Sequence, residues 1–295
     1  MDERTTSTYQ IHSERMRLLL YACGLIRGAF LRPFASHVSM PYLQDLINPS
    51  VSSSSLLHLL SEDSDAFDAF ERESDSAGHN VWHYIAVSGR VDFVNSAVAR
   101  NRDSWDLGDM LDGMSCIHLA LLDRHMTAMF PFFFQRPELQ KKTLTLAPLP
   151  LFPHNPKAKP ETKASLARRM RPLRLNLFQL AVFANKPLSF FFDPVSGFMS
   201  QEAWSMEDMG SVFHLAIWAD CAHQLSKLLQ VKSFLPFLLA CKGPCGMRVL
   251  EFAAMWNREK CVRVLLREAV FSQQDVEAAK KIAVMYGSID TLHIL

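Results

Sequence analysis

The stretch that decides the interpretation of this chain is Asp75–Val98, DSAGHNVWHYIAVSGRVDFVNSAV. It starts with two turn residues, Asp75 and Gly78, and continues with a short helical pattern. Gly89 ends that pattern, because glycine adopts the left-handed backbone conformation without steric cost. A second helical pattern begins at Val91. The stretch therefore predicts two short helices joined by a tight turn.

The same pattern returns along the chain when the position of His83 is taken as a register mark. Successive marks are separated by 35, 61, 35 and 37 residues, so only the second interval requires an insertion. The marks are His83, His118, Gln179, His214 and Glu251, with a weaker copy at His58 and a partial copy at Lys281. This spacing predicts one repeated structural unit.

The residue six places after each mark is an independent check on the register. A first helix that ends in the left-handed region favours Gly, Asn or Asp at its stop. The stop residues are Gly89, Arg124, Asn185, Asp220 and Asn257, with Gly287 in the partial copy. All except Arg124 belong to the favoured types, which supports the alignment.

The stretch from Asp75 to Gly89 closely resembles the ankyrin repeat, a family with a period of about 33 residues. The family pattern is Asp-x-x-Gly-x-Thr-Pro-Leu-His-x-Ala-Ala-x-x-Gly, followed by a second helix rich in Leu and Val. The residues that match it are Asp75, Gly78, His83, Ala86 and Gly89. The residues that depart from it are Asn80, Val81 and Trp82, which replace Thr, Pro and Leu.

The resemblance implies an all-α fold, an ankyrin-type helical solenoid with short β-turn connections. Residues 1–49 match no repeat, and the amphipathic pattern of Ile11–Phe34 predicts a helical N-terminal cap. Repeats are predicted at about 50–74, 75–108, 109–140, 173–205, 206–240, 241–274 and 275–295, with a proline-rich basic insertion at 141–172. Seven prolines within Gln135–Leu175 predict a segment without regular secondary structure.

The composition of the 295-residue chain argues against several classes of protein. A hydrophobic content of 49% is enough for a sizeable core. A net charge of +1 gives no general attraction to nucleic acid, so we do not expect nucleic acid as a partner. The sequence shows neither a secretory signal nor an apolar run long enough for a membrane span. Six scattered cysteines favour a reducing compartment, and we expect a cytoplasmic protein.

The second half of the insertion is strongly basic. Its cationic residues are Lys157, Lys159, Lys163, Arg168, Arg169, Arg171 and Arg174, against Glu161 alone. Such a run is typical of a nuclear-import signal or a polyanion patch, and equally of a solvated loop. The insertion is therefore a second candidate site, and as an import signal it would also allow a nuclear location.

No catalytic motif is recognisable, and we predict no catalytic residues, cofactor or metal ion. Cys241-Lys-Gly-Pro-Cys245 lacks the second pair of ligands that a zinc site needs. The resemblance implies a structural role for His58, His83, His118 and His214, since the family uses this imidazole to bond backbone between repeats. A cysteine enzyme stays an alternative. Its nearest pairs, Cys116 with His118 and Cys221 with His223, are two residues apart, so their side chains point to different faces of a helix.

In the ankyrin family, partner-facing positions include the two residues before the stop of the first helix. The later repeats carry aromatic and methionine side chains there, which are typical of protein-binding hot spots. The resulting partner-binding candidates are Leu122, Phe183, Trp218, Met255, Trp256, Met285 and Tyr286. The alternative is that other parts of the protein cover them.

The function that the sequence favours is non-catalytic protein–protein recognition, with a partner bound in the concave groove of the repeat stack. The departure of the repeats from the family pattern fits a bacterial or viral effector that acts in the cytosol of a host cell. The alternatives are the targeting arm of a longer enzyme and a cysteine-dependent enzyme built on the repeats.

Overall fold

The computed structural model describes residues 50–52, 54, 55, 58, 80–100, 114–123, 125–150, 170–192, 198–207 and 209–295. The chain divides into two compact units, Met1–Phe134 and Gln135–Leu295. The described part is mostly helical, as expected, although it also contains two two-stranded sheets. The predicted cap at 1–49 and the turn residues Asp75 and Gly78 lie outside the described residues.

The described residues of the first unit include two pairs of helices. They are α5 (Val81–Ser88), α6 (Val91–Arg100), α7 (Cys116–Leu122) and α8 (Met126–Phe134). Helix α5 packs against α7, and α6 and α7 both pack against α8. Gly89 separates α5 from α6 with a φ of 70°. A Cβ atom at this position would lie 2.8 Å from the ring of His125, so both backbone conformation and space favour glycine.

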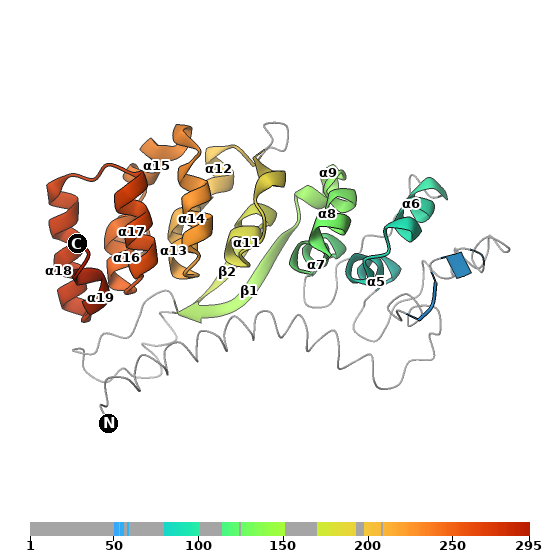
Figure 1. Cartoon of the computed structure of the whole chain (residues 1–295), viewed down its shortest axis with the longest axis horizontal. Helices are drawn as coiled ribbons and strands as arrows, with labels where there is room; N and C mark the ends of the chain where they lie inside the picture. The colour runs from blue at the N-terminus through green and yellow to red at the C-terminus, as the bar shows by residue number, and fades with distance from the viewer. Residues whose placement is uncertain are drawn as a thin grey trace, which may run out of the picture. The chain divides into compact units, whose positions relative to one another are not determined.

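The second unit is built from successive helix pairs that pack on one another (Figure 1). The first helices of the pairs are α11 (Leu177–Phe183), α13 (Val212–Trp218), α16 (Val249–Met255) and α18 (Gln273–Tyr286). The second helices are α14 (Ala222–Leu229), α17 (Glu259–Glu268) and α19 (Ile289–Leu292). Helix α11 packs on α13, α13 on α16 and α16 on α18, while α14 packs on α17 and α17 on α19.

Shorter elements fill the connections between the pairs. They are η2 (Ser189–Phe191), α12 (Gln201–Trp204), β3 (Ser205–Met206), β4 (Gly210–Ser211), η4 (Lys232–Phe234), α15 (Leu235–Ala240) and η5 (Pro244–Gly246). Trp204 lies at the centre of this region, fully buried, with its ring stacked 4.0 Å from that of Phe234 and its Nε1 donating to the Phe198 carbonyl at 2.9 Å. Burial of this large side chain anchors the connection to the helices on either side.

The helix stops adopt the backbone conformation that the sequence predicts. Gly89, Asn185, Asp220, Asn257 and Gly287 have φ angles of 70°, 54°, 58°, 52° and 67°. These five are the predicted stop residues, and each follows or closes a first helix. The prediction is therefore confirmed at every stop that the structure describes, while Arg124 lies outside the described residues.

The two ends of the proline-rich segment are ordered, so the prediction that it lacks regular structure is wrong there. A short helix, α9 (Pro137–Gln140), precedes an antiparallel pair of β1 (Thr143–Pro150) and β2 (Met170–Asn176). The register shifts between Leu146 and Leu149, next to Pro148. A two-stranded ribbon tolerates proline, because each strand has one edge whose N–H groups need no partner in the sheet.

The last helix pair also differs from the expectation. Helix α18 has 14 residues whereas α16 has 7, and it starts at Gln273. Lys281 therefore lies in the middle of a helix instead of near its start. The stop at Gly287 is predicted correctly, but the repeat pattern upstream of it is replaced by a longer helix.

Candidate binding surface

The five marks from His83 to Glu251 are the third residues of their helices, and all of them except His214 take part in capping boxes. The backbone N–H of Asn176 donates to Gln179 Oε1 at 3.0 Å, and that of Ser115 donates to His118 Nδ1 at 3.1 Å. In the same way, Asn80 N donates to His83 Nδ1 at 3.2 Å. Each of these three side chains thus accepts a hydrogen bond from a backbone N–H group that the helix start would otherwise leave without an acceptor. His58, in contrast, is exposed and does not share the buried position of the other three histidines.

Two marks of the second unit also reach the following segment of the chain. Gln179 Nε2 donates to the carbonyls of Ala203 and Ser205, both at 3.0 Å. His214 Nε2 lies 3.2 Å from the Met247 carbonyl, which can only accept, so this nitrogen carries the proton. At His214 the imidazole therefore bonds to the backbone of the following segment, as expected.

The Nδ1 atom of His214 belongs to a buried polar chain. It lies 2.9 Å from Ser211 Oγ, and Cys241 Sγ donates to that hydroxyl at 3.1 Å. Since Nδ1 is unprotonated in this tautomer, the Ser211 hydroxyl donates to it. Burial lowers the pKa of His214 to about 4, and the bond to Met247 opposes this shift. The imidazole is therefore neutral at pH 7.

Three of the described cysteines, Cys221, Cys241 and Cys261, lack the character of nucleophiles. Burial raises the pKa of Cys241, and it raises the pKa of Cys221 to about 11, with a smaller contribution from Asp220. Burial also raises the pKa of Cys261. Because the thiolate is the reactive form, these thiols are inert at pH 7. The sequence did not predict the approach of Cys241 to His214, 3.7 Å from Sγ to Nδ1, but two neutral groups do not form an activated pair.

The neighbouring pairs of the cysteine alternative do not form catalytic pairs either. Cys116 and His118 are both buried within α7, and His118 Nδ1 is 3.0 Å from Ser115 Oγ. Cys221 Sγ donates to the Ala219 carbonyl at 3.5 Å, while His223 is exposed. The side chain of Cys245 lies outside the described part.

Three first helices of the second unit, α11, α13 and α16, are fixed at their C-terminal ends by a polar side chain from the next helix pair. Gln224 Nε2 donates to Asn185 Oδ1 and to the Lys186 carbonyl, both at 3.0 Å. Thr291 Oγ1 lies 3.5 Å from the Ala254 carbonyl of α16, and its N–H donates to Asn257 Oδ1 at 3.2 Å. These contacts join the segment at the end of each of these helices to the next helix pair.

Arg258 makes the most extensive of these contacts, with a side chain only 3% exposed. Its Nε donates to the Ile217 carbonyl at 3.2 Å and its Nη2 to the Trp218 carbonyl at 2.9 Å. The guanidinium also pairs with Asp220 at 3.4 Å and lies 5.8 Å from the ring centre of Trp256. Its positive charge complements the C-terminal end of α13. Sequence reasoning missed Arg258, although a cation directly after a stop residue was the available signal.

The predicted partner-binding residues lie at the C-terminal ends of first helices, but not all of them reach the surface. Phe183 and Met255 are buried, with 6% and 2% of their surface exposed, which corrects the expectation that they face solvent. Trp218, Trp256 and Tyr286 are partly exposed, and Met285 is 50% exposed. Leu122, also partly exposed, belongs to the first unit.

Aromatic rings connect three of the helix ends. Phe183 stacks on Trp218 with ring centres 5.9 Å apart and an angle of 18°. Trp218 meets Trp256 edge to face, at 6.5 Å and 88°. Phe183 and Met255 are thus covered because neighbouring helix pairs pack closely enough to bury them, while the tryptophans remain in contact with solvent.

Comparison with protein-family models and with curated proteins finds no match to this sequence. The candidate surface is therefore judged on its geometry alone. Among the described residues, no group of three or more His, Cys, Asp and Glu side chains could hold a metal ion. None of the described helices combines the length and the apolar character that crossing a membrane requires.

The basic insertion is only partly described. Arg174 is exposed on β2, where its Nε donates to Thr143 Oγ1 of the paired strand at 3.0 Å. The side chain of Arg171 and the residues Lys157, Lys159, Lys163, Arg168 and Arg169 lie outside the described part. The predicted basic site therefore lies largely outside the described residues.

Proposed function

We propose that this chain is a non-catalytic, ankyrin-type recognition module that binds another protein at the C-terminal ends of α13, α16 and α18. The observation that carries the proposal is the partly exposed pair Trp218 and Trp256, together with the exposed Met285 on the next first helix. Aromatic and methionine side chains on a surface supply large contact areas and are typical of binding hot spots.

The rigidity of two of these helix ends, those of α13 and α16, supports the proposal. Arg258 holds the carbonyls of α13, and Ser288 and Thr291 lie within hydrogen-bonding distance of carbonyls of α16. A surface that is fixed before binding loses less conformational entropy when the partner arrives. The inert thiols argue against the cysteine enzyme, whereas a targeting arm of a longer enzyme would use the same surface.

The ankyrin part of the proposal rests on the five left-handed stops and on the bonds that Gln179 and His214 make to the following segment. These features repeat in successive helix pairs, as the resemblance implies. The effector hypothesis guides the choice of material: we would seek the partner in a eukaryotic cytosol.

The test is quantitative affinity capture from a eukaryotic cytosolic lysate with the parent chain, Met285→Lys and Gln274→Lys. Both substitutions place a cation on the exposed side of α18, but only Met285 belongs to the proposed surface. We expect a partner that the parent and Gln274→Lys retain and that Met285→Lys binds about tenfold less, with all three proteins melting at similar temperatures. No captured protein, or equal capture by Met285→Lys, would contradict the proposal.

A further inference from the structure

A pocket of about 240 Å³ lies at the opposite ends of the same helices, between the starts of α16 and α18. Its apolar walls include Leu239, Val270 and Phe271, and Val270 is 89% exposed. Its polar walls include Arg248, Glu251 and Asp275. Apolar side chains beside a few polar groups are the usual composition of a binding site.

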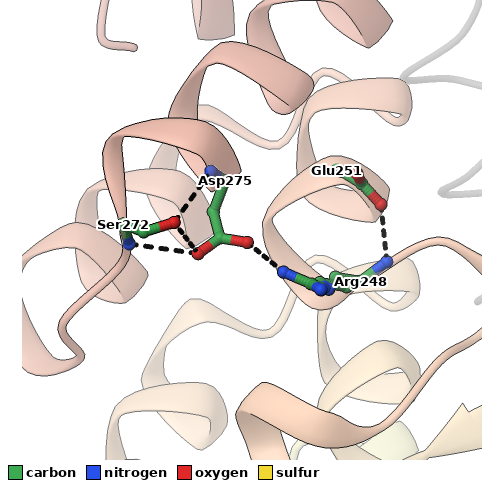
Figure 2. Close-up of polar contacts among 4 residues, drawn as sticks. All are labelled: Arg248, Glu251, Ser272 and Asp275. Atoms are coloured by element: carbon green, nitrogen blue, oxygen red, sulfur yellow. Dashed lines mark hydrogen bonds and ion pairs between the residues drawn. The ribbon is translucent and has the colours of Figure 1, made fainter.

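The polar groups of the pocket differ in how far they are already engaged (Figure 2). Asp275 accepts from the N–H and the hydroxyl of Ser272, at 3.0 and 2.6 Å, and forms an ion pair with Arg248. Glu251 accepts only from the Arg248 N–H, through Oε2 at 2.8 Å. Among the described residues, its second carboxylate oxygen has no hydrogen bond. Because the charges of Arg248 and Asp275 compensate each other, Glu251 leaves the pocket with a net charge of −1.

Glu251 occupies the position that Gln179 and His214 occupy in the two preceding helix pairs. Gln179 donates from Nε2 to the carbonyl of Ala203, in the short helix α12, and to that of Ser205, which has an extended backbone. His214 donates from Nε2 to the carbonyl of Met247, whose backbone is also extended. Glu251 has no proton to donate at pH 7. The chain after α17 also enters the long helix α18 almost at once, at Gln273. The pocket therefore lies where the earlier pairs receive an extended segment, with an acceptor in place of the donor.

We propose that this pocket binds an extended peptide segment of a partner protein. A backbone N–H or a lysine side chain of the peptide donates to the open oxygen of Glu251, and an adjacent apolar side chain contacts Leu239, Val270 and Phe271. The negative charge of the pocket favours basic over acidic peptides. This site is separate from the surface of Trp218 and Trp256 and does not depend on it.

The substitution Glu251→Gln tests the role of the acceptor without removing the helix cap. Gln179 shows that glutamine accepts from the N–H at the helix start while its Nε2 donates outward. Val270→Ser tests the apolar wall at a position too exposed to affect folding. Melting curves of both variants would establish that each is folded.

The experiment is a titration of the ¹⁵N-labelled chain with the probe peptide Ac-Gly-Lys-Leu-Lys-Gly-NH₂, and with its counterpart that carries Glu in place of Lys. We expect saturable shifts of the amide signals of Arg248, Glu251 and Ser272, with a Kd of about 1 mM for the basic probe and weaker binding of the acidic one. Glu251→Gln should weaken the basic probe about fivefold, and Val270→Ser should weaken both probes. Absence of saturable shifts up to about 10 mM, or unchanged binding by the folded Glu251→Gln variant, would overturn the proposal.

Discussion

The two ends of the first helices in the second unit are joined to their neighbours in different ways. At the C-terminal ends the contact repeats three times, through Gln224, Arg258 and Thr291. At the N-terminal ends it repeats only twice, through Gln179 and His214, and stops at Glu251. Side-chain to backbone hydrogen bonds therefore hold the stack along the C-terminal edge throughout, whereas at the N-terminal edge the Arg248–Asp275 ion pair replaces them between α16 and α18.

The difference between the two edges comes from the type of one side chain. Glutamine and neutral histidine each combine an acceptor for the helix start with a donor for the next segment. A glutamate in the same place keeps the acceptor and loses the donor. The C-terminal ends of the first helices can thus form a rigid surface, while the N-terminal ends of α16 and α18 border a pocket.

The largest effect should come from Arg258→Met, which removes the most buried contact of the C-terminal edge. The Trp218 carbonyl would lose its donor, the Ile217 carbonyl would keep only the Asp220 N–H, and the Asp220 carboxylate would lose its cation. We expect the free energy of unfolding to fall by about 3 kcal/mol, measured by chemical denaturation. Arg263→Met, at an exposed ion pair on α17, is the control and should change stability by less than about 0.5 kcal/mol. Equal effects of the two substitutions would contradict the role of this edge.

The next effect tests the N-terminal edge through its dependence on pH. The pKa of His214 is lowered in the folded protein, so between about pH 6.5 and pH 4 the unfolded chain binds more protons. The contribution of His214 to stability is therefore complete above about pH 6.5 and is lost as the pH falls toward 4. Parent and His214→Gln should diverge over this range by about 2–3 kcal/mol, with the parent losing more. Parallel stability profiles would show that His214 is not held neutral.

A somewhat smaller effect is expected at the aromatic rings. Trp218→Ala removes contacts with Phe183 and Trp256, and should lower the free energy of unfolding by about 2 kcal/mol because the side chain is only partly buried. Thermal and chemical denaturation would measure this loss. Unchanged stability would mean that the rings do not contribute to the packing between helix pairs. Since the loss is expected, Met285→Lys is the cleaner probe of binding.

The smallest effect concerns the helix stops. Asn185→Ala and Asn185→Gly both remove the acceptor for Gln224, but only alanine resists a φ of 54°. We expect the alanine variant to be less stable than the glycine variant by about 1 kcal/mol in denaturant unfolding. If the two variants are equally stable, Asn185 does not hold the left-handed conformation in solution.

Local signals in the sequence were enough to predict the helix stops and the starts of the first helices that precede α18. Gly89 and Asn257 report their own backbone conformation, because few residue types adopt a positive φ cheaply. Contacts between distant residues left no comparable signal. Arg258 bonds to residues about forty positions earlier, and the burial of Phe183 and Met255 depends on how closely neighbouring pairs approach. The strands around Pro148 were missed because the rule against proline applies to central strands and not to a two-stranded ribbon.

The most direct test of how successive helix pairs are joined is a pH titration of His214, monitored in long-range ¹H–¹⁵N spectra of the imidazole. We predict that the His214 imidazole is protonated only at Nε2, which bonds to the Met247 carbonyl, and that it stays neutral until the pH approaches about 4. A ring that titrates near pH 6.5, as a solvent-exposed histidine does, would contradict it. In that case successive helix pairs would not be joined through this position, and the contrast with Glu251 would lose its basis.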